Sequence, residues 1–358
     1  MTKSEQITSL ISKKFFLPQY IYTDIYVKDG SQELEFCDCL IEFDAVYVAI
    51  QIKERNPSAS GSSQKWFEKK VLKIAKGQIK DTFDYFKNTD NTIFSKTSDL
   101  TIDRQKTILP VIVFLNTEMD EYQRIVYSQS LDCDINIFSY DDFKTMLETI
   151  VIPYDILNYL AYRTVFKTVK KGNVVIDDVD DIATFLTIPQ NETDYAELFL
   201  ARTYYKALIE DGVNEDNINL YNYVLSELNK SINFDRDKFI AGLLCVDYVR
   251  ADKIARNWSK LMELAKENIF VRPFKITKED RIYMMLARPN TMPEDEFFFR
   301  LELAMVYSRH IDGVKVAHII AIRYMGDEQY SVELSDFDLQ KDIRYEELIE
   351  KAVDDVVS

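Results

Sequence analysis

The stretch that decides the fold is residues 33–53, which read ELEFCDCLIEFDAVYVAIQIK. Two apolar runs, Leu34–Ile41 and Ala45–Lys53, flank a short polar turn, and each has the length of a β-strand. In such a hairpin, opposed residues share one face of the sheet and successive residues alternate between the two faces. The sequence therefore predicts an antiparallel hairpin whose faces differ in character.

Three polar residues fall on one face of this hairpin. With the turn centred between residues 43 and 44, Asp38 opposes Ala49, so Asp38, Gln51 and Lys53 project to the same side with Asp38 diagonal to Gln51. Asp and Lys are poor strand formers, so packing does not explain their presence. The alternative is an edge hairpin whose polar residues face solvent, and a one-residue bulge would break the arrangement.

The chemistry of these three side chains favours phosphodiester hydrolysis. Carboxylate and amide oxygens bind hard divalent cations, so Asp38 and Gln51, with a backbone carbonyl, are expected to hold Mg²⁺ or Mn²⁺. The ion would polarise the phosphate and generate hydroxide, while Lys53 orients the water or stabilises the developing charge.

The pattern resembles that of the PD-(D/E)XK nuclease superfamily, in which an acid on one strand is followed by (D/E/Q)-x-K on its antiparallel neighbour. Here Asp38 is followed, after twelve residues, by Gln51-Ile52-Lys53. The expected order of a helix, a hairpin, a helix and two strands is similar to the αβββαβ core of that superfamily, which restriction endonucleases share. The resemblance covers residues 1–150 and implies a metal-dependent nuclease.

Two departures from the superfamily pattern bear on activity. Cys37 stands where the pattern has proline, which is a common variation. Gln51 replaces the second acid, and a neutral amide binds metal more weakly than a carboxylate. Glu35 beside the hairpin, or Glu5 on a predicted leading helix over Ser4–Phe16, is expected to restore the missing negative charge.

A second helix is predicted over Trp66–Lys87. Its helical wheel places Phe67, Val71 and Ile74 on the sheet-facing side, and Gln78 lies within the same apolar arc. A buried amide without partners costs about 1–3 kcal/mol, so Gln78 needs a partner. The resemblance implies that this partner is the metal site; the alternative is a boundary glutamine that reaches past the helix to solvent.

Charge is distributed unevenly along the chain. The formal net charge is −16, yet Lys53–Lys80 carries eight basic and two acidic residues. Such a local excess suits a polyanion such as nucleic acid, DNA in preference to RNA, although a solvated lysine-rich helix face is the alternative. Most lysines of the helix predicted over Trp66–Lys87 lie on the side opposite the sheet, where they either contact phosphate groups or keep the surface soluble. We expect nucleic-acid contacts from Arg55, Lys65 and Lys70.

Composition excludes several other classes of protein. With 358 residues, 47% of them hydrophobic and 29% charged, the chain is globular and large enough for more than one domain. No apolar stretch approaches the roughly 20 residues that cross a bilayer, and the N-terminus lacks a secretory apolar region, so we expect a cytoplasmic protein. Two histidines, four cysteines without a CxxC motif and the lack of a glycine-rich phosphate loop disfavour histidine-dependent, zinc and NTP-driven chemistries.

Three domains are expected: an α/β nuclease-like domain over 1–150, a mainly helical region over 151–275 and a small α/β unit over 276–358. The predicted function is a Mg²⁺-dependent nuclease, in a setting such as antiviral genome defence or restriction. The later regions are expected to mediate self-association or to bind a partner protein. The alternative is a non-catalytic nuclease-like scaffold that binds protein or nucleic acid, and Gln51 keeps that alternative open.

Overall fold

A computed structural model of the chain describes residues 18–339 except positions 44, 57, 59, 117, 120, 165–190, 207–212, 231–242, 244–245 and 279. The chain forms two compact units, residues 1–205 and 206–358, where the sequence predicted three domains. The predicted helical region does not stand alone. Helices α5 (Pro153–Tyr162) and α6 (Glu192–Lys206) place Ile156, Tyr159 and Phe199 in the core of the first unit, so its boundary moves well past residue 150.

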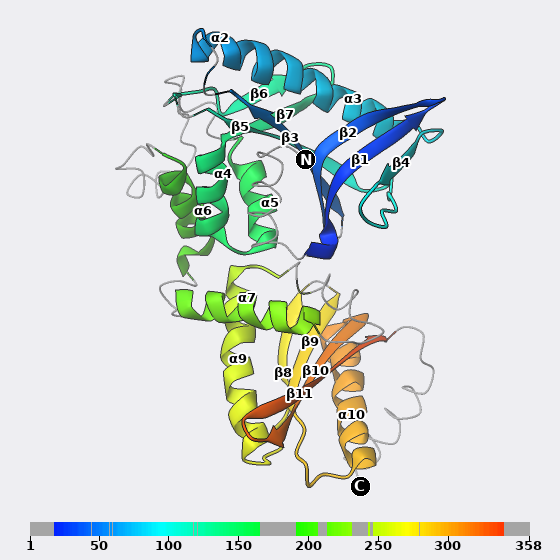
Figure 1. The fold of residues 1–358 in the computed structure, drawn as a ribbon. Helices are drawn as coiled ribbons and strands as arrows, with labels where there is room; N and C mark the ends of the chain where they lie inside the picture. The colour runs from blue at the N-terminus through cyan, green and yellow to red at the C-terminus, as the bar shows by residue number, and fades with distance from the viewer. Residues whose placement is uncertain are drawn as a thin grey trace. The chain divides into compact units, whose positions relative to one another are not determined.

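The first unit contains a seven-stranded mixed sheet with strand order β4-β1-β2-β3-β5-β7-β6 (Figure 1). Neighbours pair antiparallel except β3 with β5 and β5 with β7, which are parallel. The unit is therefore mixed α/β, as predicted. The strands are β1 (Ile21–Asp29), β2 (Gln32–Glu42), β3 (Val46–Glu54), β4 (Thr92–Ser95), β5 (Thr107–Leu115), β6 (Ile125–Ser128) and β7 (Cys133–Ser139).

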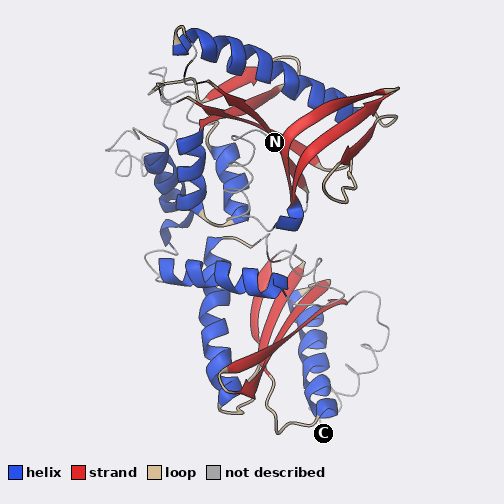
Figure 2. Ribbon diagram, viewed as in Figure 1, coloured by secondary structure: helices blue, strands red, loops and turns tan. Residues whose placement is uncertain are grey.

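Helices cover both faces of this sheet (Figure 2). One face packs against a continuous helix over residues 63–87, which consists of α2 (Ser63–Phe67), a π-helical stretch over Glu68–Ala75 and α3 (Lys76–Lys87). The other face packs against α4 (Tyr140–Ile150), α5 and α6. Strand β5 is an unbroken apolar run because a central parallel strand is buried on both of its faces.

The register of the β2–β3 hairpin corrects the predicted one. Leu40, not Asp38, opposes Ala49, and Cys39 opposes Ile50, so the predicted pairing was wrong by two residues. Because side chains alternate with a period of two, a shift by two residues leaves every side chain on its predicted face. Asp38 therefore stays on the same side as Gln51, and extension of the observed register places the two residues level with one another.

The helix over residues 63–87 departs from an ideal α-helical wheel of 100° per residue. Its buried residues Phe67, Val71, Ala75 and Ile79 recur every four positions, and Ile74 is 37% exposed where the wheel had buried it. The π-helical stretch explains the difference, because i→i+5 hydrogen bonding widens the turn and reduces the rotation per residue.

The second unit contains a four-stranded sheet, order β11-β10-β9-β8, in which β9 and β10 are parallel and the outer pairs are antiparallel. Its strands are β8 (Phe274–Lys278), β9 (Arg281–Ala287), β10 (Val316–Gly326) and β11 (Gln329–Asp338), and its helices include α7 (Glu215–Lys230), α9 (Tyr248–Lys266) and α10 (Glu294–Asp312). This unit is α/β, as predicted, but it also takes in α7 and α9 from the expected helical region. Across the described part of the chain, we find no helix with the length and apolar character that a membrane span requires.

Candidate active site

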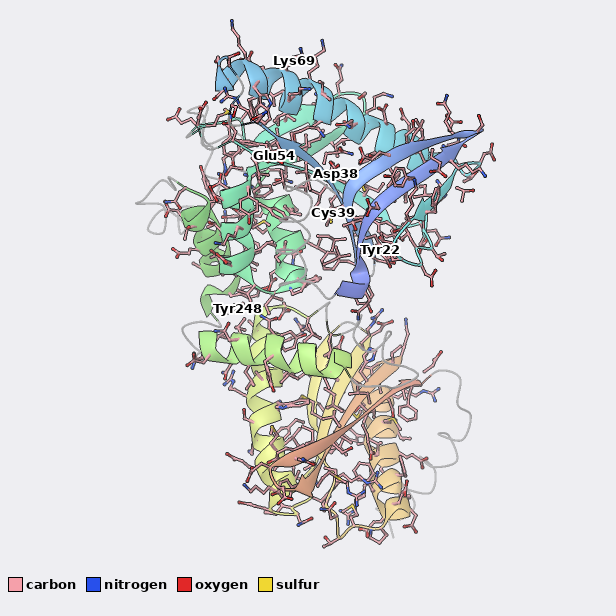
Figure 3. The ribbon with its side chains drawn as sticks, in the orientation of Figure 1. Tyr22, Asp38, Cys39, Glu54, Lys69 and Tyr248 are labelled. Carbon is pink, nitrogen blue, oxygen red and sulfur yellow. The ribbon has the colours of Figure 1, made fainter. Side chains whose placement is uncertain are left out.

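The predicted residues lie where strands β2 and β3 part, which we call the strand fork (Asp38 and Gln51–Lys53). The β2–β3 ladder ends at the pair Cys39–Ile50; beyond it β2 continues beside β1, whereas β3 continues beside β5. Asp38 lies on β2 at this point (Figure 3). Its Oδ2 accepts a hydrogen bond of 2.6 Å from the Ile52 backbone N–H, so the carboxylate takes the place of the missing ladder bond.

Lys53 joins Asp38 at the strand fork. Its Nζ lies 3.9 Å from Asp38 Oδ2 and donates a 2.8 Å hydrogen bond to the backbone carbonyl of Ile52. Both side chains are largely buried, at 15% exposed for Lys53 and 8% for Asp38. A carboxylate and an ammonium are thus held together in partial burial, where electrostatic interactions are stronger than in water.

Gln51 is the most buried member of the strand fork. It is 1% exposed, and its Oε1 is buried without a hydrogen-bond partner among the described residues. A buried oxygen of this kind costs about 1–3 kcal/mol unless a water or an ion satisfies it. The donor set of a carboxylate, an amide oxygen and a backbone carbonyl is the oxygen-rich set that Mg²⁺ prefers, so the residues present fit such an ion.

Gln78 presents a second buried amide oxygen without a partner among the described residues. It lies on α3 one turn before Thr82, whose Oγ1 lies within hydrogen-bond distance of two acceptors, the Phe36 carbonyl of β2 and the Gln78 carbonyl. The neighbouring Ile79 packs into the same cluster as Ile112, which is level with Gln51 in the sheet. The helix therefore covers the face of the sheet that carries Gln51, and the predicted place of Gln78 beside a metal stays a prediction.

Among the described residues, no second carboxylate lies at the strand fork. Glu35 is exposed on β2 and pairs with Tyr26 of β1, beyond the point where β3 has left the ladder, and Glu5 with its predicted helix lies outside the described residues. No group of three or more histidine, cysteine, aspartate or glutamate side chains suited to a metal occurs in the described ranges. Burial, then Cys39 and Asp38, raise the pKa of the Cys37 thiol, so Cys37 stays neutral beside the site.

Arg55 has a structural placement that the sequence did not predict. Its guanidinium, 7% exposed, donates to the Gly61 carbonyl at 2.7 Å and also contacts Ser63 and Glu118. It closes the loop after β3 onto the segment after β5, whereas Lys65 and Lys70 are exposed. Hydrogen bonds from Ser63 and then from Arg55 lower the pKa of Glu118. The sequence signal for Glu118 was an acid three residues after a buried strand, and only the pairing of β3 with β5 shows that this acid lies near Arg55.

Comparisons with known proteins identify no relative. No family model matches the chain, and neither the comparison with curated proteins nor that with solved structures gave a match.

Proposed function

We propose that the first unit is a metal-dependent nuclease that hydrolyses phosphodiester bonds in DNA. The order of elements supports this: an antiparallel run β1-β2-β3, the helix over 63–87 and then, after the short edge strand β4 that pairs with β1, β5 parallel to β3. This is the strand arrangement that the resemblance to the PD-(D/E)XK superfamily implies after its first helix. One fold can host many functions, so the evidence for nuclease activity has to come from the residues of the strand fork.

In this proposal, Asp38 and the Gln51 amide oxygen hold Mg²⁺ together with a backbone carbonyl. The bound ion supplies Lewis-acid polarisation of the phosphate and activation of the attacking water. Lys53 presents a positive charge beside Asp38, and it is held there by the Ile52 carbonyl. An ammonium fixed in this way stabilises the negative charge that develops on the phosphate oxygens without having to reorganise.

The observation that carries the proposal is the combination of an ion pair with an unsatisfied oxygen. Asp38 and Lys53 are 3.9 Å apart at the end of a strand ladder, and Gln51, on the same face of the sheet, has a buried Oε1 with no hydrogen-bond partner among the described residues. A purely structural site would pair that oxygen, because buried polar groups are almost always hydrogen-bonded. An oxygen left open beside a carboxylate is suited to a cation.

Plasmid cleavage tests the proposal. The full chain is incubated with supercoiled and linear DNA in Mg²⁺ or Mn²⁺, beside Lys53→Met and a matched control, Lys144→Met, at an exposed lysine of α4. We expect the wild type and Lys144→Met to cut the DNA, and Lys53→Met to lose at least about 100-fold in rate, the scale on which single charge-stabilising groups act.

Cleavage by Lys53→Met at the wild-type rate would exclude the proposed role of Lys53. The neutral Gln51 also favours a second candidate, a nuclease-like scaffold that binds without cutting. That candidate gains support if the wild type binds DNA but leaves single- and double-stranded DNA and RNA intact with both metals.

A further inference from the structure

The outer side of the helix over residues 63–87 carries a row of lysines. Lys65, Lys69, Lys70 and Lys73 are all exposed, and none of them has an ion-pair partner within the described ranges; we call these four the lysine ridge. Farther along the helix, Lys80 pairs with Asp84 and Lys76 donates to the Tyr127 carbonyl, so the ridge ends at Lys73. Unpaired positive charge is notable in a chain of formal charge −16.

The lysine ridge and the strand fork lie on opposite sides of the helix. Phe67, Val71 and Ala75 bury the inner side against the sheet, whereas Lys69 points away from the strand that carries Asp38 (Figure 3). One phosphate therefore cannot contact the ridge and Lys53 at the same time. Any polyanion held by the ridge extends beyond the group that the strand fork engages.

We infer that the lysine ridge binds the phosphate backbone of duplex DNA, away from the bond that is cut. This inference rests on the proposed function for the identity of the polyanion. The ridge spans about 12 Å of helix, over which duplex DNA presents about seven charges, enough for four lysines. Its exposed positions, which also include Gln64 and Glu68, carry no aromatic side chain on which an unpaired base would stack, and this favours a duplex over a single strand.

Salt dependence gives the inference a measurable size. Each phosphate neutralised on B-DNA contributes about −0.9 to the slope of log affinity against log salt. Removal of four lysine–phosphate contacts should therefore make the slope less steep by about 3 to 4. Between about 50 and 200 mM salt, the affinity of that variant for DNA should then fall by roughly 100-fold less than the affinity of the wild type. If DNA binding depended on net charge alone, removal of four lysines would change the salt slope equally wherever those lysines lie on the surface.

The experiment compares two variants of the full chain with equal net charge. In the first, Lys65, Lys69, Lys70 and Lys73 are all changed to Gln; in the second, the exposed Lys28, Lys144, Lys253 and Lys260 are changed to Gln. Lys and Gln have similar helix propensities, and Lys28, the one changed residue on a strand, is exposed, so both variants should fold; far-UV circular dichroism checks this. Affinity for a labelled duplex of about 30 base pairs is measured by fluorescence anisotropy in EDTA, so that no cleavage interferes, over a series of salt concentrations.

We expect the first variant to show the flatter slope and the second to keep the wild-type slope. The inference would be overturned if the two variants had equal effects or if the wild type did not bind the duplex. It would also be overturned if the wild type bound single-stranded DNA, or polyglutamate, more tightly than the duplex. Binding without cleavage would count against the proposed nuclease activity and leave the ridge standing. Where cleavage occurs, loss of the ridge should raise KM with kcat unchanged, whereas loss of Lys53 should lower kcat.

Discussion

Replacing Asp38 separates the structural role of this residue from its proposed catalytic role. In Asp38→Asn, the amide oxygen can still accept the 2.6 Å hydrogen bond from the Ile52 N–H, but the negative charge is lost. In Asp38→Ala, both the charge and the acceptor are lost. The Ile52 N–H then has no side-chain acceptor at the point where the ladder with β2 has already ended. The two variants differ in stability but should be equally poor in metal-dependent cleavage.

The magnitude follows from this hydrogen bond. A hydrogen bond to a charged group contributes about 1.5–3 kcal/mol and one to a neutral group about 0.5–1.5 kcal/mol, so Asp38→Asn should destabilise the first unit by about 1 kcal/mol. Asp38→Ala leaves a buried donor unsatisfied, which adds a further 1–3 kcal/mol or so. Lys53 keeps its bond to the Ile52 carbonyl in both variants, so its ammonium is not left without a partner.

The chain offers a selective assay for the stability of the first unit. It contains two tryptophans: Trp66 lies in the first unit and Trp258 in the second. In a Trp258→Phe background, urea unfolding followed by tryptophan fluorescence reports on the first unit alone. Trp66 is well placed for this, because its ring lies 6.4 Å from that of Phe114, which pairs with Lys53 across β3 and β5.

Two outcomes would refute this account of Asp38. Equal destabilisation by Asn and Ala would mean that the Ile52 N–H does not depend on this acceptor. Cleavage by Asp38→Asn at the wild-type rate, with the metal supplied in excess, would mean that the carboxylate holds no catalytic ion.

Two further predictions concern the neutral amide and the buried ion pair. Gln51→Glu should bind Mg²⁺ more tightly, and in excess metal each tenfold gain in affinity should add about 1.4 kcal/mol to the stability of the folded state. In EDTA the variant should melt below wild type, because its new charge is buried on the same face as Asp38. Thermal melts with and without Mg²⁺ check this, and an unchanged response to Mg²⁺ contradicts it. Glu192→Ala should destabilise the first unit by about 3–5 kcal/mol in urea unfolding, because it leaves the buried Arg163 guanidinium without its counter-charge. Burial alone would raise the pKa of Glu192, but Arg163 and Arg124 hold it below its usual value. This contribution is therefore present above the unfolded-state pKa of about 4.3 and lost as pH falls through the folded value, and Glu192→Gln should lack that acid-dependent loss.

Local pattern was enough to predict the face on which the site residues lie. Apolar runs of strand length gave the positions of β2 and β3 to within one or two residues, and alternation placed Asp38 with Gln51 and Lys53. The predicted register was wrong by two residues, and the predicted face survived because the period of a strand is two. An error of one residue would have separated Asp38 from Lys53.

Contacts between distant segments were beyond sequence reasoning. Arg55 was expected to meet phosphate, but Glu118 lies close to it only because β3 and β5 are parallel neighbours. Arg163 and Glu192 are 29 residues apart in sequence and meet because α5 and α6 pack on the same face of the sheet. No local sequence pattern predicts either the Arg55–Glu118 or the Arg163–Glu192 pair.

The sequence by itself determined the hairpin of β2 and β3, the helix that follows it, the polar face of the hairpin and the excess of lysine before residue 80, because each depends on neighbours a few positions apart. The tertiary structure alone decided where the β2–β3 ladder ends, which buried amide oxygens lack partners among the described residues, and that a π-helical stretch turns Ile74 out of the buried side of the helix over residues 63–87. These depend on how twisted strands diverge and on which surfaces meet. Such long-range packing depends on the total free energy of the folded chain, so no short stretch of one sequence shows it.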